Sequence, residues 1–233
     1  MTKEQFLIEL EKLNIKLEQK QIEQLDKFYV MMVEWNKKIN LTSILEEKEV
    51  YLKHFYDSLT LVKLIDFTKN IEVCDVGTGA GFPGIVLKIV FPNIKMKLID
   101  SLNKRIIYLN EVIKELNLKN IEALHYRMEE YSKLNEEKFD YIVSRAVSNI
   151  KVITEISIKS LKINGNIILM KAKAEEELQN IEKELNKLNA KLKDIVEFKL
   201  PIENSNRTLI KIEKISKTPK QYPEDLIKLN NKQ

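Results

Sequence analysis

The residues best suited to bind a ligand lie together near position 80 of the 233-residue chain. The segment reads Asp75-Val76-Gly77-Thr78-Gly79-Ala80-Gly81-Phe82-Pro83-Gly84 and contains four of the five glycines in the sequence. A short apolar run at 71–74 precedes it, and a helical apolar pattern at 85–91 follows it. Glycines between a strand and a helix let the backbone turn tightly and lie against a ligand with no Cβ atom in the way. The segment therefore predicts a ligand-binding loop rather than a tight turn without a ligand.

Two ligand classes fit this loop, and one acidic residue distinguishes them. Residues 79–84 formally match the dinucleotide pattern G-x-G-x-x-G, which alone is a weak signal. Asp75 ends the first strand, where a carboxylate would repel a pyrophosphate but suits a ligand with a cationic amino-acid end. Asp100 follows the next strand and can accept hydrogen bonds from the ribose diol of either ligand. Asp75 therefore favours S-adenosylmethionine, and an oxidoreductase that binds NAD(P) is the alternative.

The elements that must position this loop change in kind near residue 70. Residues 1–65 show only helical spacing of apolar side chains, with capping boxes at 2–5 and 43–46. Beyond them, predicted strands and helices alternate; the strands are 71–74, 95–99, 121–125, 139–144 and 167–170, and the helices are 85–91, 103–116 and 152–161. A charged helix at 174–192 and two closing strands, 195–200 and 208–215, complete the pattern. Such alternation indicates an α/β domain with a mostly parallel sheet and a final antiparallel pair.

Composition and charge exclude several classes of protein. One cysteine and two histidines rule out a disulfide framework and argue against a metal centre built on these residues. No apolar run approaches the ~20 residues that span a bilayer, and the first residues lack the apolar core of a signal peptide. We therefore expect a cytoplasmic protein with no membrane or metal partner. Residues 207–233 carry seven basic and three acidic side chains, which suits a polyanion partner or a solubilising tail.

Further motifs, in order along the chain, produce a specific resemblance. They are Trp35-Asn36, Asn40-Leu41-Thr42, His54 with Asp57-Ser58, the glycine loop, Asp100-Ser101 with Lys104-Arg105, and Ser144-Arg145-Ala146. With these motifs the chain resembles the RsmG (GidB) family of 16S ribosomal RNA guanine-N7 methyltransferases over most of its length. The loop alone indicates a class I methyltransferase, and the other motifs point to this family. One departure is Tyr222-Pro223-Glu224, where the family often has Tyr-Pro-Arg, which puts family-style RNA contacts from the tail in doubt.

The resemblance implies both a fold and a reaction. The implied fold is α/β: a class I S-adenosylmethionine-dependent methyltransferase domain at 66–216, Rossmann-like, with a mostly parallel seven-stranded sheet. An N-terminal helical extension at 1–65 and a basic C-terminal tail at 217–233 flank it. The implied enzyme methylates N7 of a specific guanosine in small-subunit ribosomal RNA, free or in a ribosomal particle, and is expected to be a monomer. Because N7 carries a lone pair in the neutral base, no general base is required, and we assign no catalytic residue.

The resemblance also implies the residues that contact S-adenosylmethionine. They are Gly77, Gly79, Phe82, Asp100, Met128, Glu129 and Arg145. Several keep a second interpretation on sequence alone: Phe82 as a core aromatic, Asp100 as a helix cap, Glu129 as a solvated charge, and Arg145 in an ion pair with Asp57 or Asp75.

Two reactive side chains are interpreted as structural. His54 is a tempting general base, but we favour a network of His54, Asp57 and Ser58 between the helical extension and the sheet. Cys74 lies inside the first predicted strand, so we expect a buried, inert thiol rather than an attacking nucleophile.

Basic residues around the predicted cofactor site are the candidates for RNA binding. These are Lys104, Arg105 and Lys171, with Lys173 and the C-terminal segment as further candidates. Any one of them can equally be a solvated charge.

The fourth strand is followed by Ser144-Arg145-Ala146-Val147 rather than the (Asp/Asn)-Pro-Pro-(Tyr/Phe) motif of exocyclic-amine methyltransferases. A third hypothesis is an RNA-binding or ribosome-assembly factor that keeps the fold without catalysis.

Overall fold

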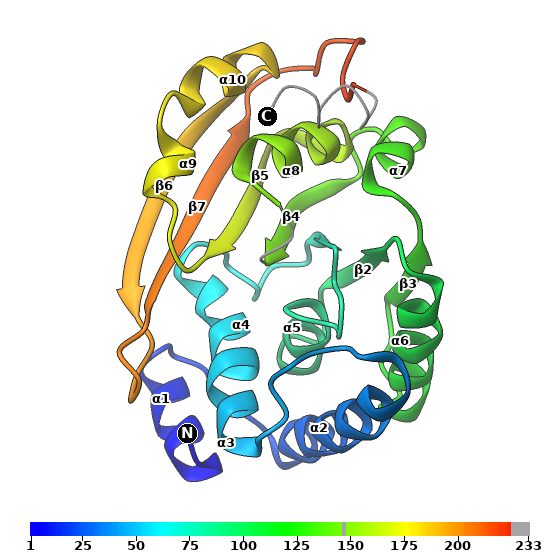
Figure 1. Ribbon diagram of the computed structural model, residues 1–233, viewed down its shortest axis with the longest axis vertical. Helices are drawn as coiled ribbons and strands as arrows, with labels where there is room; N and C mark the ends of the chain where they lie inside the picture. Colours follow the sequence, from blue (N-terminus) through cyan, green and yellow to red (C-terminus); the bar gives the residue numbers. More distant parts are fainter. Residues whose placement is uncertain (146–147, 225–233) are drawn as a thin grey trace.

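A seven-stranded sheet forms the centre of the molecule (Figure 1), in a computed structural model that describes residues 1–145 and 148–224. The strand order is β3-β2-β1-β4-β5-β7-β6. The first five strands are parallel to their neighbours, whereas β7 runs antiparallel to both β5 and β6. The strands are β1 (Glu72–Val76), β2 (Lys95–Asp100), β3 (Ile121–His125), β4 (Phe139–Arg145), β5 (Leu161–Lys171), β6 (Ala190–Lys199) and β7 (Asn206–Lys214). The predicted parallel sheet with a final antiparallel pair is confirmed.

The parallel strands are apolar on both faces because helices cover both. In β5, the side chains of Ile167 and Leu169 enter one hydrophobic core and those of Ile168 and Met170 enter the other. This alternation follows from the two-residue period of a strand, and burial on both sides explains why these strands read as continuous apolar runs.

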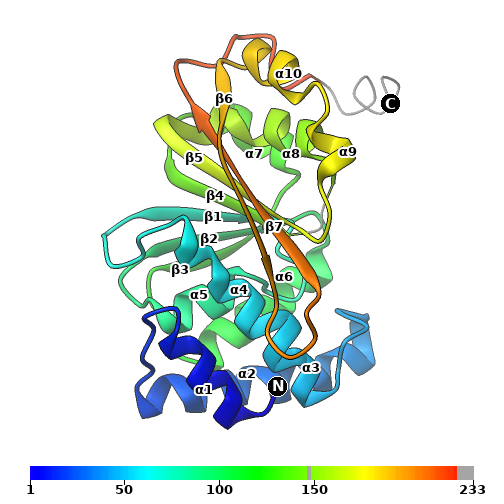
Figure 2. The ribbon, with the colours of Figure 1, turned by 90° about the vertical axis from the view of Figure 1, so that its left-hand side faces the viewer.

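Two groups of helices supply the opposite walls of these cores (Figure 2). One face packs against α5 (Gly84–Val90) and α6 (Asn103–Glu115), with the N-terminal helices beyond them. The other face packs against α7 (Met128–Leu134), α8 (Ile150–Ser157) with the 3₁₀ turn η3 (Ile158–Ser160), and α10 (Ile181–Lys187). The short helix α9 (Glu175–Leu178) precedes α10.

The N-terminal segment is helical, as predicted, and packs directly on the sheet domain. Its elements are α1 (Lys3–Glu11), α2 (Gln19–Ile39), α3 (Glu47–Val50), the π-helical turn η1 (Tyr51–Tyr56), α4 (Asp57–Leu59) and the 3₁₀ turn η2 (Thr60–Lys63). The amide of Gln21 donates to the carbonyl oxygens of Ile89 and Val90, both at 2.9 Å, at the end of α5. Phe28 on α2 is fully buried, with its ring centroid 5.3 Å from that of Phe82 in the glycine loop. The extension therefore shares one core with the sheet.

The predicted helix at 174–192 is wrong. The segment contains α9 and α10, and its last residues belong to β6. Asn180, between the two helices, and Asn189, after α10, adopt left-handed conformations with φ of 60° and 56°. Asparagine tolerates this conformation better than most residues, so it interrupts a helix without the glycine that would signal the break. Eight of the ten non-glycine residues with positive φ in the described chain are asparagines, which replace glycine at turns in this glycine-poor protein.

One of the two predicted capping boxes is confirmed and the other is wrong. Thr2 and Gln5 form the expected reciprocal hydrogen bonds at the start of α1. Ser43 caps no helix, because α3 begins at Glu47 and its cap is the side chain of Glu46. The preceding residues instead form a turn in which Thr42 Oγ1 accepts a hydrogen bond from the backbone of Ile44 at 3.1 Å.

Two features are absent from the part of the chain that the structure describes, residues 1–145 and 148–224: a membrane-spanning helix and a cluster of metal ligands. No helix within these residues has the length and apolar character needed to cross a membrane. The same residues contain no group of three or more His, Cys, Asp or Glu side chains placed to hold a metal ion.

Candidate functional site

The glycine loop between β1 and α5 is folded around the buried carboxylate of Asp75. Its Oδ2 atom accepts hydrogen bonds from Thr78 Oγ1 at 2.7 Å and from the backbone N–H of Gly84 at 2.8 Å. Burial raises the pKa of Asp75 to about 6, and these two hydrogen bonds oppose the rise. Asp75 thus joins the end of the strand to the start of the helix and shapes the loop between them.

Two glycines of this loop are needed for different reasons. A Cβ atom at Gly84 would lie 2.2 Å from Leu98 Cδ2 and 2.8 Å from Asp75 Oδ2, so only glycine lets α5 approach β1 and β2 this closely. Gly79 has a φ of 59°, and a Cβ atom there would meet only the Gly77 carbonyl oxygen, at 3.9 Å. The backbone at Gly79 therefore faces open space where a ligand could lie.

A cavity of about 440 Å³ opens beside this loop, at the carboxyl ends of β1 to β4. Ligands of open α/β sheets bind at this edge, outside the strand ends. The lining residues are Val76, Gly77, Gly79, Ile99, Asp100, Ser101, Arg105, Tyr126, Arg127, Met128, Glu129, Arg145, Ser148, Val152 and Ile156. Six of the seven residues predicted to contact the cofactor are therefore brought together here: Gly77, Gly79, Asp100, Met128, Glu129 and Arg145.

Phe82 is the predicted cofactor residue that does not line this cavity. Its ring is buried and stacks on the imidazole of His54, with centroids 4.4 Å apart and planes 22° apart. The guanidinium carbon of Arg145 lies 5.1 Å from the same ring centroid. Phe82 is thus a core aromatic in this structure, and it reaches the cavity through its contact with Arg145.

Asp100 lies at the end of β2 and lines the cavity, and its side chain does not cap α6, whose N-cap is Leu102. One carboxylate oxygen accepts from the backbone of Gly79 at 2.9 Å, and the other accepts from the backbone of Leu102 at 2.9 Å, just before α6. Arg105 forms an ion pair with the first oxygen at 3.1 Å. The side chain therefore braces the glycine loop and the start of α6 while lining the cavity.

Among the lining residues that sequence reasoning did not assign to the cavity, Ser148 precedes α8, Val152 and Ile156 lie on α8, and Tyr126 and Arg127 lie between β3 and α7. Tyr126 and Arg127 are exposed, and the ion pair of Arg127 with Glu129 is long, at 3.9 Å. The available signals were their place directly before Met128 and the scarcity of arginine, which occurs four times in the chain.

Arg145, the last residue of β4, has its guanidinium group fixed by residues of the N-terminal segment. Nη1 donates to the carbonyl oxygen of Lys53 at 2.8 Å, and Nη2 lies 3.0 Å from His54 Nδ1. Nη1 is also 3.6 Å from Asp57 Oδ2. The ion pair with Asp57 and the place at the cavity edge, proposed as alternatives for Arg145, therefore occur together.

The predicted network between the extension and the sheet is confirmed for His54 and Asp57, which contact Arg145, and it extends to β7; the side chain of Ser58 bonds only within its own helical segment. Ser58 Oγ donates to the His54 carbonyl oxygen at 2.6 Å, and Asp57 Oδ1 accepts from Arg207 Nε at 3.1 Å. Burial, with the positive charge of Arg145 beside the ring, lowers the pKa of His54 to about 3. A base this weak cannot accept a proton at neutral pH, so the structural interpretation of His54 holds.

Cys74 is fully buried in β1, as predicted, and burial raises the pKa of its thiol.

The predicted RNA-binding residues differ in how available their charges are. Lys104, at the start of α6, is exposed, as is Lys173. Arg105 is paired with Asp100, and Lys171 is held by Glu177 at 3.0 Å with only 12% of its side chain exposed. Ala146 and Val147 after β4, and Lys228 and Lys232 of the basic tail, lie outside the described residues.

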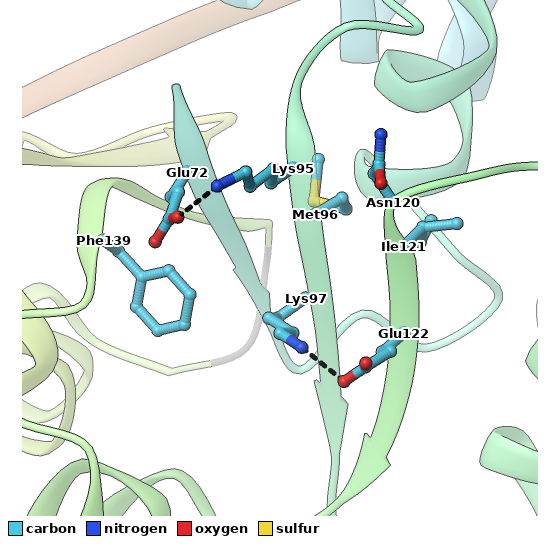
Figure 3. A pocket seen from close by; sticks show the side chains of 8 residues that line it. All are labelled: Glu72, Lys95, Met96, Lys97, Asn120, Ile121, Glu122 and Phe139. Carbon is cyan, nitrogen blue, oxygen red and sulfur yellow. Dashed lines mark hydrogen bonds and ion pairs between the residues drawn. The ribbon is translucent and has the colours of Figure 1, made fainter. Parts of the chain in front are cut away.

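A second cavity, of about 460 Å³, lies at the opposite edge of the sheet (Figure 3). It is lined by residues of the amino-terminal halves of β1 to β4 and by Asn120. Two lysine–glutamate pairs cross it, Lys95 with Glu72 and Lys97 with Glu122, so its charges are balanced within the protein. Because ligands of such sheets bind at the carboxyl ends, the cavity beside the glycine loop is the better candidate site.

Comparisons with known proteins agree with this geometry. The family described as GidB, rRNA small subunit methyltransferase G, matches residues 21–209. Ribosomal RNA small subunit methyltransferase G of Lysinibacillus sphaericus is 45% identical over 96% of this chain and 95% of its own length. The protein of that name from Bacillus subtilis has the same identity and coverage. Among solved structures, a SAM dependent methyltransferase from Aquifex aeolicus superposes with a TM-score of 0.58 and 20% identity, over 78% of this chain and 98% of that one.

Alanine at Gly84 and at Gly79 should separate folding from binding. We expect Gly84→Ala to lower the free energy of unfolding by about 3 kcal/mol, because its Cβ atom collides with Leu98 and Asp75. Gly79→Ala should cost about 1 kcal/mol of backbone strain and weaken S-adenosylmethionine binding at least about tenfold, since its methyl group enters the cavity. Urea denaturation and calorimetry measure the two effects. Wild-type affinity in a folded Gly79→Ala variant would contradict this placement of the cofactor.

The depressed pKa of His54 should make stability depend on pH. The ordinary pKa of histidine is 6.5, so His54 of the unfolded chain is protonated below that pH. In the folded protein the same ring stays neutral down to about pH 3. The free energy of unfolding should therefore fall as pH drops from 6.5 towards 3, by up to about 1.4 kcal/mol per pH unit from this group. In His54→Phe that component is absent, so the difference between wild type and variant should shrink as pH falls. Parallel stability curves would mean that His54 is protonated in the folded protein.

Proposed function

This chain belongs to the rRNA small subunit methyltransferase G family, and from that membership we propose the reaction of its cavity and the roles of its residues. The protein is an enzyme that transfers a methyl group from S-adenosylmethionine to N7 of a specific guanosine in small-subunit ribosomal RNA. The observation that carries the proposal is the convergence of Gly77, Asp100, Met128 and Arg145 on one cavity at the carboxyl ends of the strands.

The residues around the cavity fit this cofactor. Asp75 Oδ1 is a buried oxygen without a hydrogen-bond partner, next to a loop whose Gly79 faces open space. An anionic oxygen left in this state favours a cationic ligand group nearby, such as the ammonium of an amino acid. We propose that Gly77 and Gly79 form the loop side of the site, that Asp100 accepts from the ribose, and that Met128 and Glu129 hold the adenine. Phe82 supports this side indirectly, because its buried ring packs against Arg145. Arg145 closes the side from which the RNA approaches.

The chemistry asks for orientation rather than for proton transfer. When bound, S-adenosylmethionine supplies an electrophilic methyl group on a sulfonium. Guanine N7 presents a lone pair in the neutral base, so no side chain has to remove a proton before the attack. The low pKa of His54 and the burial of Cys74 agree with a site that has neither a general base nor a thiol nucleophile. The protein's task is to align donor and acceptor atoms, which alone can supply several kcal/mol of the barrier reduction.

We assign three parts of the chain to different tasks. The domain at 66–216 binds cofactor and base, the extension at 1–65 holds Arg145 at the edge of the cavity, and the basic tail at 217–233 adds affinity for RNA. The extension contributes the groups that hold Arg145, which supports its role in the site. We also propose that the enzyme acts as a monomer.

Lys104, Arg105 and Lys171 are proposed as RNA contacts, in that order of availability. Lys104 is exposed beside the cavity, whereas Arg105 and Lys171 can bind a phosphate only by releasing Asp100 and Glu177. Exposed Arg127, at the cavity mouth, is a fourth candidate of the same kind.

The reaction is tested with methyl-labelled S-adenosylmethionine and small-subunit RNA or particles that lack the modification. After digestion, we expect label in 7-methylguanosine from a single site. Asp100→Ala should abolish labelling, whereas Asp194→Asn, an exposed change on β6, should not. Label in another nucleoside would contradict the N7 assignment, and cofactor binding without label would favour a non-catalytic RNA-binding protein.

Salt dependence should identify a phosphate contact. Lys104→Gln is expected to weaken RNA binding and to reduce the slope of log affinity against log salt concentration by about 0.7–0.9, the contribution of one contact. The control is Lys69→Gln, because Lys69 is 72% exposed and precedes β1 at the opposite edge of the sheet. Filter binding over a range of salt concentrations measures both. Equal slopes in the two variants would remove Lys104 from the RNA interface.

A further inference from the structure

The contacts that fix the Arg145 guanidinium come almost entirely from a short stretch of the N-terminal segment. Lys53 supplies a carbonyl oxygen, His54 a ring nitrogen and Asp57 a carboxylate, while the ring of Phe82 lies beside the group. Lys53 and His54 belong to the π-helical turn η1, a form of helix found frequently at functional sites. The orientation of a residue at the cavity edge is thus set from outside the sheet domain.

The hydrogen bond between Arg145 and His54 has a defined direction. A guanidinium group has donors and no acceptor, so a hydrogen bond from Arg145 Nη2 to His54 Nδ1, at 3.0 Å, requires the lone pair on Nδ1. The carbonyl oxygen of Lys53, 3.2 Å from the same nitrogen, would instead require a proton there. We assign the lone pair to Nδ1 because the contact with Arg145 is the shorter one and its donor is charged. The ring proton then resides on Nε2, which lies 3.0 Å from Thr42 Oγ1 and can donate to it. Protonation of Nδ1 would destroy this arrangement by placing two cations in contact, in agreement with the low pKa of His54.

A chain of contacts extends this arrangement back to α2. Asn36, near the end of α2, accepts on Oδ1 from the backbone N–H groups of Leu41 at 2.6 Å and Thr42 at 2.9 Å. Thr42 in turn meets His54, and His54 meets Arg145. Thr42 and His54 each contact a residue before and a residue after them in this chain of contacts, so a shift of either would be felt by Arg145.

We propose that His54 is a positioning residue: its neutral Nδ1 accepts from Arg145 and holds the guanidinium at the edge of the cofactor cavity. This inference rests on the proposed function, because it supposes that Arg145 faces the cofactor and the RNA base. The tautomer of His54 and its acceptor atom can nevertheless be measured whether or not the protein methylates RNA. His54 itself does not line the cavity and is buried, so it acts through Arg145 rather than on the substrate.

Two substitutions separate the acceptor from the ring. In His54→Asn the amide oxygen can occupy the position of Nδ1 and accept from Arg145, but the ring stacked on Phe82 is lost. In His54→Phe the stacked ring remains and the acceptor is lost. His54→Gln is the matched polar control, because its amide extends towards the position of Nε2 and Thr42 rather than Nδ1.

Cofactor affinity and steady-state kinetics on the unmodified particle are measured for the three variants, together with thermal stability. We expect His54→Phe to remain folded and to lose at least about tenfold in kcat/KM and in S-adenosylmethionine affinity, the usual effect of losing a hydrogen bond to a charged group. His54→Asn should stay within about threefold of wild type in both, and His54→Gln should resemble His54→Phe. Full function in His54→Phe, or equal losses in the Asn and Phe variants at equal stability, would overturn the proposal.

Nitrogen NMR of the imidazole provides a readout that needs no activity. The chain has two histidines, so the signals missing from His54→Phe identify His54. We expect the tautomer with the proton on Nε2 from pH 8 down to pH 5. A proton on Nδ1, or a charged ring in this range, would overturn the inference even if the enzyme methylates RNA. If the wild type binds the cofactor but does not methylate, the proposed function fails, and the tautomer and the cofactor affinities of the variants still decide the role of His54.

Discussion

The buried carboxylate of Asp57 lies between two guanidinium groups, Arg145 at the end of β4 and Arg207 at the start of β7. Taking these three charges out of water costs several kcal/mol per ion, and only close pairing offsets that cost. α4, β4 and β7 must therefore meet at one point for the charges to be paired. The ion pair of Lys53 with Glu203, at 3.1 Å, ties η1 to the connection between β6 and β7 at the same corner (Figure 2). The extension, the parallel strands and the antiparallel hairpin are placed relative to one another by this requirement.

The two sides of the cavity are held in place by different parts of the chain. Its cofactor side consists of loops after parallel strands, where Asp75 and Asp100 organise backbone N–H groups of the glycine loop and of α6. The Arg145 side depends on the extension, through Lys53, His54 and Asp57. The first side is built within the sheet domain, whereas the second also needs the N-terminal helices.

The buried charged groups in this site hold neighbouring segments in place and take no part in proton transfer. Asp75 and Asp100 each accept hydrogen bonds from two or more donors. Asp57 is paired with both Arg207 and Arg145, and His54 stays neutral at physiological pH. A reaction that needs no proton transfer is well served by such a site, because fixed dipoles and charges orient the reactants without any reorganisation during the step. Lys104, at the start of α6, and Arg127, at the cavity mouth, are exposed and can meet a polyanion.

Local sequence was sufficient for the order of most elements and for the glycine loop, whereas the resemblance to the family supplied six of the lining residues. The elements and the loop depend on periods of two and about four residues, and on glycine at positions close to one another in the chain. It failed where asparagine replaced glycine, as at Asn180, because a left-handed asparagine resembles any other polar residue in a sequence pattern. It also could not place Phe82, whose partners His54 and Arg145 are distant in sequence. Arg145 is 92 residues from Lys53, and Arg207 is 150 residues from Asp57. Such long-range pairs form only when α4, β4 and β7 pack around the buried carboxylate of Asp57. Local sequence patterns contain no information about this packing, so only the tertiary structure decided the pairs.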